Sequence, residues 1–318
     1  MHPPLVSVCI PTYNHERYIR QCLESALMQS ADVSLEVLIG DDGSTDGTQH
    51  IARYFRERYP DIIHYHRHTT KKGAGGNLEY LARTARGKYI AHLDGDDFWL
   101  PQKLRSQITF LEANEDAPAA YTNAFCILDS GLPLGVFSNF AGQRINATEL
   151  VRRGNFLHHS SLIYRASFLE DLFYRGSPLL DYNFHLSLSR HGALAYLPTP
   201  FTVYRVSSST SILVHSNEYV RELYWKTLSD TAEPLVTPAD LSAGMAEFMR
   251  SVFFRSIRLR SFHLIANWWP RILRNAPLGK TKLLAQAGWS IFRVGMREAF
   301  SSMCGRIVGN NMKILYPK

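Results

Sequence analysis

Cysteine is scarce in this 318-residue sequence, and its four cysteines lie far apart. They are Cys9, Cys22, Cys126 and Cys304, and they form no C-x-x-C pair. This spacing argues against a zinc site and against a disulfide framework, which need cysteines at short or regular intervals. We therefore expect buried free thiols and a reducing, cytoplasmic compartment.

Long apolar runs are also missing. No window reaches the roughly 18 uninterrupted apolar residues of a membrane-spanning helix, and the N-terminal sequence MHPPLVSVCIPTYN has no basic segment followed by an apolar stretch. We expect neither a spanning helix nor a signal peptide. With 45% hydrophobic and 20% charged residues, the chain should be globular with a large core, as one big domain or one domain plus an appendage.

Charge is unevenly distributed along the chain. Residues 1–214 carry 20 Lys and Arg against 21 Asp and Glu, a net charge of −1. Residues 215–318 carry 15 against 7, a net charge of +8. We therefore expect one domain at 1–214 and a basic C-terminal region at 215–318.

The first two hundred residues alternate strand-like and helix-like patterns. Short apolar runs predict strands at residues 5–10, 36–40, 62–66 and 89–93, and helical spacing predicts helices at 15–30, around 51–55 and at 76–84. This order implies an α/β fold with a mostly parallel sheet covered by helices on both faces. Ligands of such sheets bind at the carboxyl ends of the strands.

Three of these strands end in polar segments. The first continues as PTYN (11–14), the second as DDGS (41–44) and the fourth as DGDD (94–97). Because these ends should meet at one edge of the sheet, we expect one crevice that holds an aromatic ring, a small-residue turn and several carboxylates.

The carboxylates of Asp94, Asp96 and Asp97 repel one another, so a cation is expected near them. One interpretation is a magnesium or manganese ion held by one or two carboxylates, water and the diphosphate oxygens of a substrate. Gly95 would let the backbone turn without a side chain in the way. The other interpretation is a solvated acidic turn.

Asp41 and Asp42 also have two interpretations. The turn DGST favours a helix cap, and we expect capping to be the whole role of Ser44 and Asp46. Alternatively, one of the two carboxylates accepts a hydrogen bond from a ligand such as a pyrimidine base, while the ring of Tyr13 stacks on it.

The glycine-rich segment KKGAGGNLEYL precedes a helix, which suggests phosphate binding. Its glycines do not fit G-x-G-x-x-G and do not directly follow a strand. We therefore expect a flexible loop there. The pair His158 and His159 has no helical i, i+4 partner, and we do not expect a metal site there.

Together, four segments resemble the family 2 glycosyltransferases over residues 5–211. They are VSVCIPTYNHERYIRQCLESALMQ, EVLIGDDGSTDGT, GGNLEYLARTARGKYIAHLDGDDFWLPQKLRSQITFLEAN and YNFHLSLSRHGALAYLPTPFTVYR. The resemblance implies a GT-A fold, which is a Rossmann-like, mostly parallel sheet flanked by helices, here with a C-terminal helical extension. It also implies an inverting transfer of sugar from a nucleotide-diphosphate donor, with UDP- or dTDP-sugars favoured, in bacterial surface-polysaccharide synthesis.

The resemblance also implies roles for individual residues. Asp181 falls at the place of the general base, and Asp94 and Asp96 fall on the D-x-D motif, with Asp96 the expected direct ligand of Mn²⁺ or Mg²⁺. The residues implied to bind the nucleotide sugar are Pro11, Tyr13, Asp42, Asn77, Asp94, Gly95, Asp96 and Arg205.

The sequence departs from the family pattern at two places. Leu180 replaces the acidic or glycine residue that often precedes the base, and desolvation by this leucine would raise the pKa of Asp181. Ser207 stands where many relatives carry a histidine, which leaves Arg205 as the expected cation for the diphosphate.

The C-terminal region mixes arginine with large aromatic residues. Between residues 250 and 310 they include Arg255, Arg258, Arg260, Arg271, Arg274, Phe253, Phe254, Trp268 and Trp269. Helices lying on an anionic membrane surface have this composition, and so does a helical subdomain with solvated arginines. Nucleic acid is not expected, because no nucleic-acid module accompanies the charge. A membrane surface would fit a lipid-linked saccharide acceptor and a peripheral location at the inner face of the cytoplasmic membrane.

Three functions compete on these observations. The first is a metal-dependent sugar transferase. The second is a nucleotidyltransferase, which usually carries a glycine-rich basic signature after the first strand, where this chain has PTYNHERY. The third is a catalytically impaired sugar-nucleotide binder or scaffold at the membrane, suggested only by Leu180 and Ser207.

Overall fold

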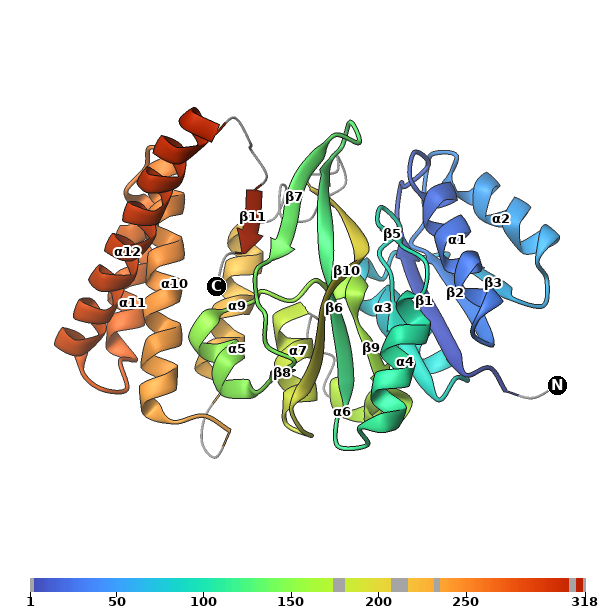
Figure 1. Cartoon of the computed structure of the whole chain (residues 1–318), viewed down its shortest axis with the longest axis horizontal. Helices are drawn as coiled ribbons and strands as arrows, with labels where there is room; N and C mark the ends of the chain where they lie inside the picture. Colours follow the sequence, from blue (N-terminus) through green and yellow to red (C-terminus); the bar gives the residue numbers. More distant parts are fainter. Residues whose placement is uncertain (1–2, 174–180, 207–216, 232–234, 309–312, 317–318) are drawn as a thin grey trace. The chain divides into compact units, whose positions relative to one another are not determined.

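The computed structural model of the chain describes residues 3–173, 181–206, 217–231, 235–308 and 313–316 (Figure 1). Two compact units are formed: one from Met1–Ile145, Leu157–Val220 and Met312–Lys318, the other from Asn146–Phe156 and Arg221–Asn311. The predicted domain boundary at residue 214 lies outside the described residues.

The first unit begins with the alternation of strands and helices that the sequence predicts. Its elements are β1 (Val6–Thr12), α1 (Ile19–Met28), β2 (Leu35–Asp41), α2 (Thr48–Arg58), β3 (Ile63–Arg67), α3 (Gly73–Thr84) and β4 (Tyr89–His92). The strands lie in the order β4-β1-β2-β3, and every pair among them is parallel. The α/β fold is thereby confirmed.

Beyond β4 the sheet continues with mixed strand directions. The strands are β5 (Phe98–Trp99), β6 (Ala119–Leu128), β7 (Pro133–Ser138), β8 (Arg144–Ile145), β9 (Ile163–Arg165) and β10 (Leu194–Val206). Strand β9 is antiparallel to both β4 and β6, whereas β10 runs parallel to β6. The short strand β11 (Lys313–Tyr316) joins the edge beside β7 in parallel.

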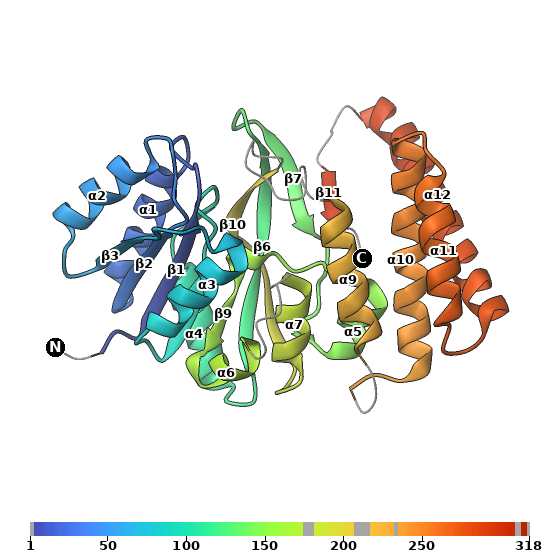
Figure 2. The ribbon, with the colours of Figure 1, turned by 180° about the vertical axis from the view of Figure 1, so that it is seen from behind.

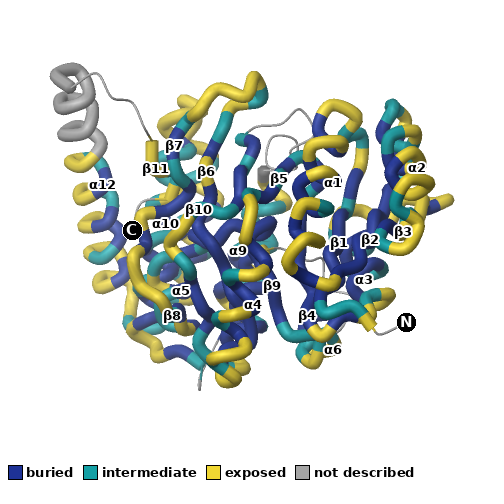
Figure 3. Tube along the Cα trace, turned by 45° about the vertical axis from the view of Figure 1, so that its right-hand side comes forward, coloured by how far each residue is buried: buried dark blue, intermediate teal, exposed yellow. Residues whose placement is uncertain are grey.

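Helices cover both faces of this sheet. Helices α1, α2 and α4 (Lys103–Ala113) lie on the face seen in Figure 1, and α3 and α7 (Asp181–Ser189) lie on the face seen in Figure 2. All seven residues of β2 are buried, as expected for a parallel strand covered on both sides. Figure 3 shows this burial across the central strands.

Small residues set the distance between the sheet and α3. An added Cβ at Gly40 of β2 would lie only 2.1 Å from Oδ1 of Asn77 in α3. No larger side chain fits there, because atoms cannot approach so closely. Helix α3 begins at Gly73, three residues earlier than predicted, and so includes the glycine-rich segment.

The second unit is helical in the described residues, as predicted. It contains α5 (Ala147–Arg153), most of α9 (Asn217–Ser229), α10 (Pro238–Arg258), α11 (His263–Arg274) and α12 (Lys280–Val308). Thr237 and Asp240 form a capping box at the start of α10. None of the described helices has the length and apolar character needed to cross a bilayer.

The cysteines of the first unit match the expectation of buried thiols. Cys9, Cys22 and Cys126 are free and buried, and burial raises the pKa of Cys9 and Cys22. The side chain of Cys304 lies outside the described residues.

Candidate functional site

The strand register brings the three predicted polar segments to one edge. Thr12 at the end of β1 pairs with Asp41 at the end of β2, and Cys9 pairs with His92 of β4. The amide of Leu93 then donates to the carbonyl of Cys9, which extends the alignment to the start of the D-x-D segment. The carboxyl ends of β2, β1 and β4 are therefore neighbours, with Pro11 opposite Gly40.

Hydrogen bonds join the turn after β1 to the turn after β2. The Asn14 amide donates to Oγ of Ser44 at 3.0 Å, and Oδ1 of Asn14 accepts from the Thr45 amide at 2.8 Å. Asn14 has φ of 55°, a left-handed conformation that asparagine tolerates. Ser44 therefore links the two turns, and the expectation that it only caps a helix is wrong. Asp46 accepts from the Thr48 amide at the start of α2 and also from the Glu16 amide at 3.0 Å, so capping is not its whole role either.

Asp42 holds the start of α3. Its two carboxylate oxygens accept from the amides of Lys72 at 2.6 Å and Gly73 at 3.0 Å. An anion at a helix N-terminus is favoured because the first amides have no partner inside the helix. The expectation of a flexible loop at this glycine-rich segment is wrong for Gly73 and the following residues. A contact between Asp42 and a nucleotide base stays a prediction.

The exposed ring of Tyr13 contacts the ammonium group of Lys71, a residue that the sequence did not single out. Nζ of Lys71 lies 3.9 Å from the centre of the Tyr13 ring and donates to its hydroxyl at 2.6 Å. A lysine over an aromatic face gains roughly 0.5–1 kcal/mol when exposed. The 58 residues between them explain why no local pattern showed this pair. Lys71 thus adds a positive charge beside the crevice.

Asn77 lies behind the crevice, with a side chain that is 1% exposed. Its Nδ2 donates to the carbonyl of Gly40 at 2.7 Å, and its Oδ1 lies 2.9 Å from Nε2 of His68. Both polar atoms are thus used inside the protein, where they fix α3 against the end of β2. Contact of Asn77 with a donor stays a prediction.

The D-x-D segment follows β4 directly. The Asp94 side chain is 41% exposed, with Oδ1 at 2.9 Å from Nε2 of His92 and Oδ2 at 3.1 Å from Oγ of Ser160. Burial alone would raise the pKa of Asp94, but the neighbouring histidines, first of all the hydrogen-bonded His92, together hold this pKa well below its usual value. Asp94 is therefore ionised at neutral pH.

Gly95 is required by close packing. An added Cβ would lie 2.5 Å from Nδ1 of His15 and 2.9 Å from Oγ1 of Thr12. The D-x-D turn can therefore rest directly on the end of β1 only when its central residue has no side chain. This contact brings Asp94 and Asp96 beside the turn of residues 11–14.

Asp97 has a role different from the other two carboxylates. It is 2% exposed, and its Oδ2 accepts from Oγ of Ser160 at 2.6 Å and lies 3.1 Å from Nε2 of His158. Its Oδ1 accepts from the backbone amide of Arg205 at 2.9 Å. Asp97 therefore joins the D-x-D turn to residues 158–161 and to β10.

Arg205 lies next to the D-x-D segment, where a diphosphate-binding cation was predicted. Its Nε donates to the carbonyl of Asp96 at 3.2 Å, and its Nη2 donates to Oε1 of Gln21 at 3.2 Å. The guanidinium also stacks over the ring of Tyr18 at 4.7 Å. The guanidinium is thus held in place by three neighbours.

Buried histidines surround the inner side of Asp94. The rings of His92 and His159 are 4.0 Å apart, and Nδ1 of His159 lies 3.5 Å from Nε2 of His185 in α7. Burial lowers the pKa of His159 and lowers that of His185 to about 3. The imidazoles of His159 and His185 are therefore neutral at pH 7, and their contacts with each other and with His92 link β4 to α7.

Asp181, the predicted general base, is the first residue of α7. Asp181 is exposed to solvent, with neighbouring protein atoms packed around part of its carboxyl group. This burial, together with the negative charge of Asp94, raises the pKa of Asp181 to about 6. Asp181 therefore lies within electrostatic reach of Asp94, and its role as general base stays a prediction. Leu180 and Ser207 lie outside the described residues.

The C-terminal strand reaches the same site, which the sequence did not indicate. The ring of Tyr316 in β11 lies 4.6 Å from that of Phe137, and Phe137 contacts His158 at 5.1 Å. The pKa of Tyr316 is raised by burial and by the charge of Asp181. Tyr316 therefore adds an aromatic hydroxyl near the predicted base.

Asp94 and Asp96 offer oxygen ligands suited to a hard cation. Within the described residues, no group of three or more His, Cys, Asp or Glu side chains is placed to share a metal ion. A cation bound here would take its remaining ligands from water and from a substrate, which is usual for Mg²⁺ and Mn²⁺ beside phosphates. The donor set fits such an ion.

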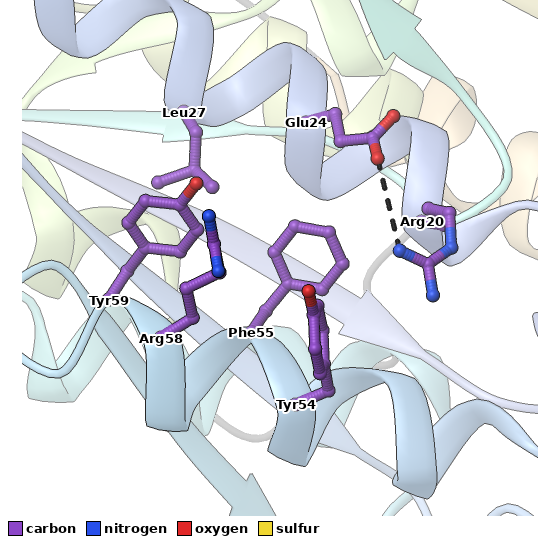
Figure 4. A pocket seen from close by; sticks show the side chains of 7 residues that line it. All are labelled: Arg20, Glu24, Leu27, Tyr54, Phe55, Arg58 and Tyr59. Carbon is purple, nitrogen blue, oxygen red and sulfur yellow. Dashed lines mark ion pairs between the residues drawn. The ribbon is translucent and has the colours of Figure 1, made fainter.

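A separate pocket lies between α1 and α2, away from the strand ends (Figure 4). It has a volume of about 290 Å³ and is lined by Arg20, Glu24, Leu27, Tyr54, Phe55, Arg58 and Tyr59. The guanidinium of Arg20 lies over the rings of Tyr54 and Phe55. None of the predicted site residues lines this pocket, and the candidate site is the edge of the sheet where the carboxyl ends of β2, β1 and β4 are neighbours.

The mostly parallel α/β sheet, with helices on both faces and a D-x-D turn after β4, is of the GT-A fold class. The family model of glycosyl transferase family 2 matches residues 7–173. The chain therefore belongs to glycosyl transferase family 2, as its sequence motifs predict.

Relatives of known sequence agree with this assignment. An uncharacterized protein of Mycobacterium tuberculosis is 28% identical over 223 residues, which are 70% of this chain and 64% of that protein. Chondroitin synthase of Escherichia coli is 30% identical over 73% of this chain and 33% of its own length. An E. coli UDP-Glc:α-D-GlcNAc-diphosphoundecaprenol β-1,3-glucosyltransferase is 36% identical over 42% of this chain and 51% of its own. The chain thus spans less than two thirds of these proteins.

Solved structures share the fold. TarS 1-349 of Staphylococcus aureus, in complex with UDP-GlcNAc, superposes with a TM-score of 0.59 at 20% identity, over 78% of this chain and 72% of that one. A mannosyltransferase of Pyrobaculum calidifontis, in complex with GDP-Man and Mn²⁺, gives a TM-score of 0.53 at 18% identity, over 92% of this chain and 88% of that one. At these identities the likeness shows the fold alone.

The buried contacts of Asp97 predict that Asp97→Ala is strongly destabilising. The substitution leaves the Arg205 amide and the Ser160 hydroxyl without their acceptor, so the free energy of unfolding should fall by about 2–3 kcal/mol. Urea denaturation followed by circular dichroism measures this change. Asp116→Ala removes an exposed carboxylate paired with Arg144 and should cost less than about 1 kcal/mol. Equal losses in the two variants would contradict the anchoring role of Asp97.

Proposed function

We propose that this chain is an inverting glycosyltransferase that moves a sugar from a nucleotide-diphosphate donor to a hydroxyl of a saccharide acceptor. The observation that carries the proposal is the opposite environment of two carboxylates in one crevice: Asp94 is held ionised beside Asp96, whereas Asp181 has its pKa raised to about 6. Family membership supports the same reaction. UDP- or dTDP-sugars are favoured, and the relatives and neighbours that name UDP-Glc or UDP-GlcNAc support a UDP-sugar.

Asp181 is proposed as the general base. An acceptor hydroxyl is a poor nucleophile at neutral pH, so a carboxylate must take its proton as the oxygen attacks the anomeric carbon. With a pKa of about 6, Asp181 is mostly ionised at pH 7 and is still more basic than an ordinary aspartate. One base is sufficient, because a single displacement forms no covalent sugar intermediate.

The donor diphosphate is proposed to lie between the D-x-D segment and the two cations of the crevice. Asp96 and Asp94 would hold Mn²⁺ or Mg²⁺, an ion that stabilises negative charge on a departing diphosphate when bound. Arg205, fixed beside Asp96, supplies a guanidinium for the phosphate oxygens, and Lys71 supplies an ammonium near Tyr13. Pro11, Tyr13 and Asp42 are proposed to line the base pocket.

The acceptor is proposed to be a lipid-linked saccharide of surface-polysaccharide synthesis. This rests on the E. coli relative whose acceptor is a diphosphoundecaprenol-linked sugar and on the Bacillus subtilis relative named for teichuronic acid biosynthesis. Such an acceptor would place the protein in the cytoplasm, at the inner face of the cytoplasmic membrane. No contact with nucleic acid is proposed.

Donor binding is tested by thermal shift with a panel of UDP-, dTDP- and GDP-sugars, each with and without Mn²⁺. A bound donor stabilises the fold by mass action, so at least one UDP- or dTDP-sugar should raise Tm, and Mn²⁺ should increase that shift. Asp96→Asn should remove the increase due to Mn²⁺. If no nucleotide sugar raises Tm, with or without Mn²⁺, the transferase proposal is wrong. Binding without any hydrolysis or transfer would favour the impaired binder.

Asp181→Asn should separate binding from transfer. The amide is similar in size to the carboxylate, so the donor-dependent rise in Tm should remain, while the rate of transfer should fall ~100-fold or more because the general base is lost. Transfer is measured by release of the nucleoside diphosphate in the presence of acceptor. Asp171→Asn, at an exposed carboxylate outside the crevice, is the matched control and should keep full activity. Undiminished turnover in Asp181→Asn would refute the assignment.

The raised pKa of Asp181 predicts the pH dependence of the reaction. Below pH of about 6 the carboxyl is protonated and accepts no proton, so kcat/KM should fall about tenfold per pH unit on the acid side. Above pH of about 6, kcat/KM should become independent of pH. A bound cation would offset the charge of Asp94 and move the midpoint slightly lower, though still above that of an ordinary aspartate. A profile of kcat/KM that stays flat down to pH of about 4 would contradict this role.

A further inference from the structure

Helix α12 is apolar on two opposite faces. One face, formed by Leu283, Ala287, Ser290 and Val294, is buried, and polar contacts join it to α10, as between Oγ of Ser290 and Glu247. The opposite face carries Trp289, Phe292 and Met296, all exposed, and the exposed Leu284 lies at its edge. An apolar helix face is stable only when it is covered, so α10 accounts for one face of α12 and leaves the other to be explained.

The exposed face forms a continuous stripe. Trp289, Phe292 and Met296 recur at spacings of three and four, which keeps them on one side of a helix, and Trp289 and Phe292 are 65% and 57% exposed. Ala285 and Gly288 are also exposed and lie on the same side of the helix. From Leu284 to Met296 the stripe extends for about 18 Å along the helix axis.

Basic residues follow one border of the stripe. They are Lys282, Arg293 and Arg297, and all three are exposed. Basic residues outnumber acidic ones in this unit. Its described acidic side chains are moreover already engaged, since Glu149, Glu222, Asp230, Asp240 and Glu247 each form an ion pair with an arginine or lysine. Arg293 itself lies 3.9 Å from Glu247, so Lys282 and Arg297 contribute most of the positive charge at the border of the stripe.

We propose that the outward face of α12 lies on an anionic lipid surface, with Trp289, Phe292 and Met296 inserted among the headgroups and upper acyl chains. Tryptophan and phenylalanine beside arginine and lysine are suited to this boundary, where the rings are buried and the charges meet lipid phosphates. Because the stripe runs along the helix, α12 lies parallel to the surface. Long basic side chains can reach the phosphates from the border of the stripe.

A second copy of the chain is the other way to cover the stripe, and charge disfavours it. Two α12 helices packed stripe to stripe would bring Lys282, Arg293 and Arg297 of both copies to the border of one interface. Like charges facing one another across an interface are repulsive. An anionic surface, by contrast, complements the same residues.

The inference differs from the sequence-based interpretation in the residues it assigns. Trp268, which the sequence placed among the membrane aromatics, is buried against Trp225 and Phe248. Arg271 stacks over Trp268 at 4.9 Å and pairs with Glu222 at 2.6 Å. Trp268 is therefore packed interior, as the alternative of a helical subdomain with solvated arginines predicts, whereas the Arg271 side chain is 40% exposed.

The test uses full-length protein and flotation with vesicles of phosphatidylcholine, with or without phosphatidylglycerol. The wild-type protein should float with the anionic vesicles and much less with the neutral ones. The double variant Trp289→Glu/Phe292→Glu should reduce flotation by about tenfold or more, because charged residues replace the inserted rings. Lys282→Gln/Arg297→Gln should reduce flotation with anionic vesicles by roughly tenfold and should not change flotation with neutral vesicles. Met28→Glu, at an exposed apolar position of α1, is the matched control and should float like the wild type.

The position of the inserted residue is tested by fluorescence quenching with spin-labelled lipid. Vesicles that carry the quencher should lower the tryptophan fluorescence of the wild-type protein. In Trp289→Phe most of this quenching should disappear, while the protein still floats with the vesicles. Circular dichroism should show equal folding of all variants, since the substituted side chains are exposed.

Three results would overturn the proposal: wild-type protein that does not float, flotation unchanged in the double variant, or quenching unchanged in Trp289→Phe. A dimer in sedimentation velocity that Trp289→Glu dissociates would also overturn it, because a second copy would then cover the stripe. The assay needs neither donor nor acceptor, so its outcome is independent of the transferase proposal.

Discussion

The candidate site depends on the buried carboxylate of Asp97. Its partners come from segments that are distant in the sequence: Ser160 is 63 residues away and Arg205 is 108. An unpaired buried charge is costly, so these contacts must form together when the chain folds. Once they form, the D-x-D turn is fixed between residues 158–161 and β10, and the solvent-facing carboxylates of Asp94 and Asp96 acquire a defined direction. The guanidinium of Arg205 is fixed beside them by the same strand.

The sequence predicts the frame of this site well but not its supporting contacts. Short apolar runs locate β1, β2 and β4, and parallel topology then brings their ends together whatever the side chains are. The pattern DGDD does not reveal that Asp97 faces inward while Asp94 reaches solvent, because that difference is set by Ser160 and His158. The contact between Lys71 and the ring of Tyr13 is not visible in the sequence for the same reason, since folding alone brings the two residues together.

Two carboxylates of the crevice are pushed in opposite directions by neighbouring groups. His92 stabilises the charge of Asp94, while burial and that same charge oppose ionisation of Asp181. Opposed pKa shifts in one site separate the tasks of its carboxylates. An aspartate that stays ionised is suited to binding a cation, and one that titrates near neutrality is suited to accepting a proton. The neutral His159 and His185 allow this separation, because charged rings there would stabilise both anions.

The C-terminal unit shows why composition alone does not distinguish a packed helix from one at a membrane. Its arginines and aromatic residues occur in both environments: Arg271 lies over the buried Trp268, whereas Arg293 follows the border of the exposed stripe. What separates the two is the angular position of each residue on its helix. In α12, Leu283 faces inward and Leu284 faces outward, since successive residues differ by about 100°. Only the packing of α12 against α10 shows which of its two apolar faces is left over.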